Sequence, residues 1–154
     1  MTTEPKQTPM GLERFVDVDG INTRYFDEGD GAPIVFLHGG NFGSAGGAST
    51  ARIWEPVFNQ LKGDFNAISV DRLGQGYTDN PLRDEDYTMD AVVQHLAALI
   101  RKLGKGPCHL VGHSRGGYIV ARLALEHPDV AKTVVIVSSG TLSPGVLRNR
   151  PVRC

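Results

Sequence analysis

Short apolar runs alternate with amphipathic segments along most of the chain. Six runs of four to seven residues, either apolar or alternating between apolar and polar, predict strands. These expected strands span residues 12–18, 21–27, 34–37, 67–70, 108–111 and 133–137. Apolar residues spaced three or four apart predict helices over residues 54–61, 88–103 and 115–127. From the third strand onward, one helix therefore separates each strand from the next.

Turn and capping residues support these boundaries. Asp19 and Gly20 separate the first two strands and predict a two-residue hairpin turn. Thr88 suits the N-cap of the longest helix, and Gly104 suits its end. Strands that alternate with helices form parallel sheets covered on both faces. We therefore expect an α/β fold, with a mostly parallel sheet, an N-terminal antiparallel hairpin and helices on both faces.

The same pattern predicts one domain with two short ends. The first ten residues are polar and include Pro5 and Pro9, so we expect residues 1–10 to be disordered. Residues 11–145 hold all of the expected strands and helices and form the expected domain. Residues 146–154 are basic and lack periodicity, which predicts an irregular tail.

Composition narrows the classes of function. The 154 residues include 16 basic and 17 acidic side chains, for a formal net charge of -1. Such a chain has no overall field for nucleic acid or an anionic membrane, and its apolar runs are too short to span a bilayer. Cys108 lies in an expected strand and Cys154 is the last residue, which predicts reduced thiols and a cytoplasmic location. The sequence shows no metal-ligand spacing.

The Gly-His-Ser-Arg-Gly motif of residues 112–116 is the most informative one. It follows an expected strand and opens an expected helix. A serine at a sharp strand-to-helix turn, flanked by glycines that let two backbones pass closely, is a nucleophile elbow. The alternative is that Ser114 only caps the helix. Two more glycine-rich turns follow strands: His-Gly-Gly at residues 38–40 and Asp-Arg-Leu-Gly-Gln-Gly at residues 71–76.

These three turns occur in the order and spacing of the α/β-hydrolase superfamily, and residues 12–143 resemble its N-terminal part. Within it, the loop at residues 38–47 and the segment at residues 138–145 resemble most closely the meta-cleavage product hydrolases, which cleave a carbon–carbon bond. Related esterases and lactonases share the same motifs. Dehalogenases and epoxide hydrolases use an aspartate where this chain has Ser114. The resemblance implies a truncated α/β-hydrolase core.

The resemblance also implies roles for individual residues. Ser114 is the nucleophile, and the backbone N–H groups of Gly40 and Arg115 form the oxyanion hole, unless Gly40 serves only a tight turn. Asn41 binds substrate or merely serves its turn, and the Arg115 side chain attracts a carboxylate or is simply solvated. The implied reaction hydrolyses a carbon–carbon bond next to a ketone, or an ester, in a small-molecule substrate. It needs no cofactor.

A serine nucleophile requires a histidine base and a carboxylate, and the sequence offers no obvious pair. The five histidines are His38, His95, His109, His113 and His127. The two in glycine-rich turns match positions where the family uses histidine for turn packing, and the other three have ordinary structural interpretations. Asp71 is expected to organise the turn at residues 74–76. Family members carry the acid and the histidine on later strands, so we expect a truncated or frameshifted product.

The expected strand at residues 133–137 is rich in valine and isoleucine and would form an edge of the sheet. Because exposed edges pair with other chains, we expect self-association through this strand. The alternative to a serine hydrolase is a catalytically weak or inactive binding module. In a third alternative, a separate chain supplies the missing acid and histidine.

Overall fold

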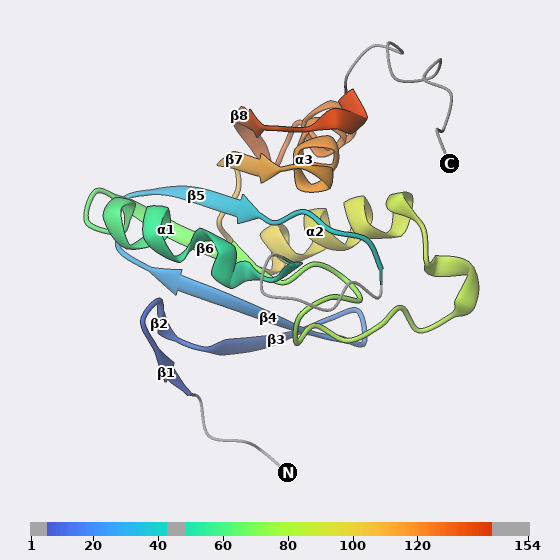
Figure 1. The fold of residues 1–154 in the computed structure, drawn as a ribbon, viewed down its shortest axis with the longest axis horizontal. Coiled ribbons are helices and arrows are strands. Elements are labelled where there is room, and N and C mark those ends of the chain that lie inside the picture. Colours follow the sequence, from blue (N-terminus) through green and yellow to red (C-terminus); the bar gives the residue numbers. More distant parts are fainter. Residues whose placement is uncertain (1–5, 43–48, 143–154) are drawn as a thin grey trace, which may run out of the picture.

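The computed structural model describes residues 6–42 and 49–142. One sheet has the strand order β3-β4-β6-β5-β7-β8, from the bottom to the top of Figure 1. Its strands are β3 (Arg14–Val18), β4 (Ile21–Glu28), β5 (Ala32–Leu37), β6 (Phe65–Val70), β7 (Cys108–His113) and β8 (Ala131–Val137). The last four pair in parallel, while β3 and β4 pair antiparallel at one side. The expected mostly parallel sheet with an antiparallel hairpin is confirmed.

Helices cover both faces of this sheet. They are α1 (Glu55–Leu61), α2 (Met89–Leu103) and α3 (Arg115–Glu126), with short 3₁₀ turns η2 (Ala51–Trp54), η3 (Asp84–Asp86) and η4 (Gly140–Leu142). Successive side chains of β5 point to opposite faces of the sheet and therefore pack in different layers. Phe36 packs in an apolar cluster with Phe58 of α1. Val35 and Leu37 belong instead to a larger cluster with residues of α2 and α3.

The fold includes residues that the sequence assigned to a disordered end. β1 (Gln7–Thr8) and β2 (Gly11–Leu12) form a small antiparallel sheet, and Met10 between them is fully buried. Glu13 interrupts the single strand expected at residues 12–18, because its N–H donates to the Lys6 carbonyl at 2.9 Å. Residues 7–10 thus belong to the fold. Residues 1–5 and the expected tail at residues 146–154 lie outside the described residues.

Helix α2 has the ends that its sequence predicts. The Thr88 hydroxyl accepts a hydrogen bond from the Ala91 N–H at 3.1 Å, and Gly104 ends the helix with a φ of 65°. On the side that faces the sheet, His95 Nε2 lies 2.9 Å from the Thr23 hydroxyl of β4. Burial lowers the pKa of the His95 imidazole to about 4, although the Asp19 carboxylate opposes the shift.

Helix α3 approaches β5 and β7 at backbone contact distance. A Cβ at Gly112 would lie 2.3 Å from the Gly116 carbonyl oxygen. A Cβ at Gly116 would lie 2.5 Å from the Leu37 carbonyl oxygen and 2.6 Å from that of His38. Real Cβ atoms do not approach backbone oxygens so closely, so glycine at both positions is a steric requirement of this packing.

We predict that Gly112→Ala lowers the free energy of unfolding by about 2 kcal/mol or more, because the methyl group overpacks a backbone contact that cannot relax. Gly63→Ala is the matched control, since a Cβ at Gly63 meets no atom within 4 Å. That control should change stability by less than about 0.5 kcal/mol. Urea unfolding of both variants measures the difference, and equal midpoints would contradict the packing argument.

We also predict that His95 makes the fold sensitive to acid. The unfolded chain binds a proton at His95 below a pH of about 6.5, whereas the folded chain does so only near a pH of about 4. Stability is therefore lost as the pH falls through this window, by up to about 3 kcal/mol less the part that solvent screens. Urea unfolding of His95→Gln should show a shallower decline between pH 6.5 and 4 than the unsubstituted chain.

Candidate active site

The glycine-rich turns meet at the carboxyl ends of the parallel strands. β5 and β7 are neighbours, so the turn after His38 lies beside the turn at Ser114 (Figure 1). From β5 the chain continues through α1 on one face to β6, and it returns to β7 through α2 on the other face. Ligands of open α/β sheets bind in the crevice at such a switch in connection.

Ser114 occupies a sharp turn between β7 and α3. Its backbone has a φ of 54° and a ψ of -122°, a conformation that few non-glycine residues adopt. Its N–H donates to the Val137 carbonyl at 2.8 Å, and its carbonyl accepts from the Gly117 N–H at 3.0 Å. The side chain makes no capping hydrogen bond, which removes the alternative that Ser114 serves only as a helix cap.

The turn after β5 lies directly against Ser114. A Cβ at Gly39 would be 2.8 Å from Ser114 Cβ and 3.3 Å from Ser114 Oγ. Gly40 has a φ of 93°, and a Cβ there would be 2.4 Å from Ser49 Oγ. Glycine at these positions therefore allows the backbone to come within reach of the serine hydroxyl.

Arg72 fixes the orientation of this turn. The arginine is buried, and its Nη2 donates to the Gly40 carbonyl at 2.6 Å and to the Gly39 carbonyl at 3.3 Å. In a trans peptide, the carbonyl of one residue and the N–H of the next point in opposite directions. Because the Gly39 carbonyl points to Arg72, the Gly40 N–H points away from Arg72.

Gln75 extends the same network to the next peptide. Its side-chain amide donates to the Asn41 carbonyl, and its oxygen accepts from Arg72. The Asn41 side chain itself is exposed. The sequence assigned no role to Arg72 or Gln75, although both lie in the turn motif at residues 71–76. The sequence does contain a signal for these roles. An arginine and a glutamine lie within a glycine-rich turn, where their long side chains can donate hydrogen bonds to backbone carbonyls.

Positive charge gathers beside Ser114. Burial, and then repulsion from Arg115, lower the pKa of Arg72 to about 10. The charge of Arg115 therefore acts on the Arg72 guanidinium. Arg115 is half-buried and begins helix α3, whose N-terminus adds the positive end of the helix dipole. This arrangement favours an anion or a developing negative charge near the serine.

His38 cannot act as the base in this arrangement. Its Nδ1 lies 2.8 Å from the Gly39 carbonyl, and its Nε2 accepts from the Arg72 N–H at 3.1 Å. Burial, with a further contribution from Arg72, lowers the pKa of the imidazole to about 3. Both ring nitrogens are thus committed to packing the turn, as the sequence resemblance implies.

The other histidines also lack a contact with the serine hydroxyl. His95 bonds to Thr23, His109 Nδ1 lies 2.8 Å from the Thr133 hydroxyl, and His127 Nδ1 lies 3.2 Å from Arg101 Nη2. The half-buried His113 has no hydrogen-bond partner at Nδ1 within the described part of the chain. Among residues 6–42 and 49–142, no side chain hydrogen-bonds to Ser114 Oγ.

Asp71 organises the turn that follows β6. Its fully buried carboxylate accepts from the Ala51 N–H at 2.6 Å and the Tyr77 N–H at 2.8 Å. It also pairs with Arg24 Nη1 at 3.4 Å. Burial raises the pKa of Asp71 in spite of these partners. The buried Arg24 is a third residue to which the sequence assigned no role.

Three further findings concern metal ligands, membrane spans and the thiol of Cys108 in the described residues. No group of three or more histidine, cysteine or acidic side chains in residues 6–42 and 49–142 is arranged to hold a metal ion. In the same ranges, every helix is too short or too polar to cross a membrane. Cys108 is fully buried, and burial raises the pKa of its thiol to about 11. Cys108 therefore packs in the core.

In sequence, the chain is similar to known hydrolases. The chain is 33% identical over 132 residues to the 2-hydroxy-6-oxo-6-(2'-aminophenyl)hexa-2,4-dienoic acid hydrolase of Metapseudomonas resinovorans, covering 85% of this chain and 43% of that protein. It is 32% identical over 139 residues to the 2-hydroxymuconate semialdehyde hydrolase of Pseudomonas sp. (strain CF600), covering 90% and 47%. The chain thus spans less than half the length of these relatives.

A solved structure and a family model also match the chain. A mutant of the Vigna radiata epoxide hydrolase superposes with a TM-score of 0.71 at 31% identity, covering 82% of this chain and 38% of that one. Residues 32–150 match the family model described as the alpha/beta hydrolase fold. Since that match includes the turns after β5, β6 and β7, the chain belongs to the α/β-hydrolase family.

Proposed function

We propose that this chain carries the nucleophile and the oxyanion hole of a serine hydrolase. Ser114 is the nucleophile, and the N–H groups of Gly40 and Arg115 bind the oxyanion. The observation that carries the proposal is the position of the strained Ser114 turn against Gly39, beside a loop whose Gly40 N–H points away from Arg72. Strained residues concentrate at functional sites.

In the proposed reaction, Ser114 Oγ attacks a carbonyl carbon and the carbonyl oxygen becomes negative. Each N–H donor in an oxyanion hole is worth about 3 kcal/mol in the transition state. The charges of Arg72 and Arg115 stabilise the same oxygen through the surrounding medium. The described residues contain no histidine in contact with Ser114, so the proposal requires the base to come from elsewhere.

The relatives suggest the class of substrate. Their names describe hydrolases of a dienoic acid and of a semialdehyde. We propose a small molecule with a carbon–carbon bond next to a ketone, or an ester, with Asn41 and the Arg115 side chain binding the substrate, in a cytoplasmic setting. A binding module with little activity is the second candidate, because both nitrogens of His38 are committed to the turn.

A fluorophosphonate probe tests the reactivity of Ser114. Because the described residues supply no base for Ser114, we expect labelling to be slower than in an active serine hydrolase but to reach one adduct per chain, with complete loss in Ser114→Ala and unchanged labelling in Ser139→Ala, whose hydroxyl pairs with that of Thr141. Intact-protein mass spectrometry measures the adduct and peptide mapping locates it. If the unsubstituted chain stays unlabelled while an active serine hydrolase reacts in parallel, the binding module is favoured.

We further propose self-association through β8. Within the described residues, β8 pairs only with β7 and forms one edge of the sheet. Val135, Ile136 and Val137 are 51%, 46% and 37% exposed. An exposed strand with apolar side chains and unpaired backbone groups favours pairing with a second copy.

We predict that this chain is a dimer and that Val135→Lys shifts it toward the monomer, because a charged side chain disfavours pairing at an edge. Val57→Lys is the matched control, since Val57 is 41% exposed on α1. Light scattering after size exclusion gives the mass of each variant. A monomer at high concentration, or equal effects of the two substitutions, would argue against pairing through β8.

A further inference from the structure

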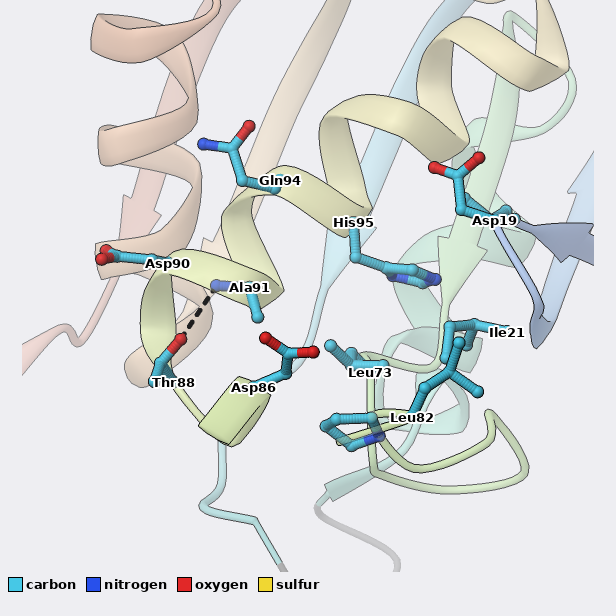
Figure 2. Close-up of a pocket in the computed structure, with 12 residues that line it drawn as sticks. Asp19, Ile21, Leu73, Leu82, Asp86, Thr88, Asp90, Ala91, Gln94 and His95 are labelled. Atoms are coloured by element: carbon cyan, nitrogen blue, oxygen red, sulfur yellow. Dashed lines mark hydrogen bonds between the residues drawn. The ribbon is translucent and has the colours of Figure 1, made fainter. Parts of the chain in front are cut away.

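A cavity lies away from Ser114. It has a volume of about 440 Å³ and opens between the β3–β4 hairpin, the chain that follows β6 and the first turns of α2 (Figure 2). In the sheet, β6 and β5 separate β4 from β7, and Ser114 follows directly after β7. The cavity is therefore distinct from the candidate active site. Small-molecule sites have volumes of about 300–1,000 Å³.

The lining is mostly apolar. Its apolar residues are Val18, Ile21, Leu73, Pro81, Leu82 and Ala91. Leu82 is 69% exposed and the other large side chains are part of the core or lie beside it. An apolar lining with few polar groups is typical of a site for a compact organic molecule.

All charged groups that line this cavity are carboxylates. Asp86 pairs with Arg83 at 2.8 Å, and Asp90 pairs with Arg122 at 2.6 Å. Asp19 lines the same cavity, and no basic side chain of the described residues pairs with it. The cavity thus carries one uncompensated negative charge, which favours a cationic ligand and disfavours an anionic one.

His95 adds a hydrogen-bond acceptor beside this carboxylate. The Thr23 hydroxyl donates its proton to the Ile21 carbonyl at 3.1 Å, so it accepts from His95 Nε2–H. The imidazole is therefore the Nε2–H tautomer, and its Nδ1 carries a free lone pair. Figure 2 shows the His95 side chain extending from α2 toward the hairpin that carries Asp19 and Ile21.

We propose that this cavity binds a small organic ammonium ion with a compact apolar body. The apolar body packs against Leu73, Pro81 and Ala91, and the ammonium group donates hydrogen bonds to the Asp19 carboxylate and to His95 Nδ1. The site is independent of the reaction at Ser114, so Ser114→Ala should bind the same ligand with unchanged affinity.

Titration of the ¹⁵N-labelled full chain with 2-phenylethylamine at pH 7 tests the proposal. We expect saturable shifts at the amides of Gly20, Leu82 and Ala91, with a dissociation constant on the order of 1 mM for so small a ligand. The neutral 2-phenylethanol has the same apolar body and should bind about five-fold more weakly, and 3-phenylpropanoate weaker still. Absence of saturable shifts at these amides, or equal binding of amine and alcohol, overturns the proposal.

Two variants test the charge of Asp19 and the space of the cavity separately, and a third variant is the control. Asn tolerates a positive φ, so Asp19→Asn should preserve the hairpin at a φ of 52° while it weakens amine binding about five-fold. Asp64→Asn removes one negative charge from the exposed turn before β6 and should leave the affinity unchanged. Ala91→Leu fills the cavity and should abolish binding of all three probes. If Asp19→Asn binds the amine as tightly as the unsubstituted chain, Asp19 is not part of the site.

Discussion

The contact between the first turn of α3 and the ends of β5 and β7 is the constraint on which the candidate site depends. Backbone atoms occupy the space that a Cβ would need at Gly112 and Gly116. Helix α3 can therefore take this position only if both residues are glycine. To reach that position within one residue of β7, the chain adopts a φ of 54° at Ser114, which costs about 1–3 kcal/mol. Burial of Ile119, Leu123 and their neighbours offsets this cost.

The hydrogen bonds of buried arginine side chains fix the turns on the other side of the candidate site. A buried guanidinium needs acceptors, and Arg72 finds them in the carbonyls after β5. The same requirement pairs Arg24 with Asp71, which in turn holds the turn at Tyr77. Stability and the proposed oxyanion role are thus linked, because the hydrogen bonds that satisfy Arg72 are the ones that orient the Gly40 N–H. Loss of the arginine would remove this donor from the Gly40 carbonyl and the Gln75 side-chain oxygen and leave the loop without a fixed orientation.

The periodicity of the sequence was enough for the parallel sheet, the two helical layers and the Ser114 turn, since these follow from local patterns of apolar residues and glycine. It was not enough for the buried Arg24 or for Met10. Arg24 lies in a hairpin strand, and Asp71, one of its two carboxylate partners, follows a different strand far along the chain. Met10 follows Pro9 in a polar segment and is buried only because β1 and β2 fold back against the sheet. Such contacts depend on tertiary structure and leave little local trace.

Within the described residues, the packing that positions Ser114 and the loop at Gly40 is independent of any histidine that could act as the base. The loop at Gly39 and Gly40 and the turn at Ser114 are fixed by helix packing and by the Arg72 network, neither of which involves a base. His38 strengthens this independence, because its neutral ring is part of the scaffold and exchanges no proton with the serine. Half-buried Ser114 remains accessible beside two guanidinium groups. For the proposed reaction, a histidine from outside the described residues therefore has to form a hydrogen bond to Ser114 Oγ and be oriented by a carboxylate, whereas the positive charge beside the serine is already in place.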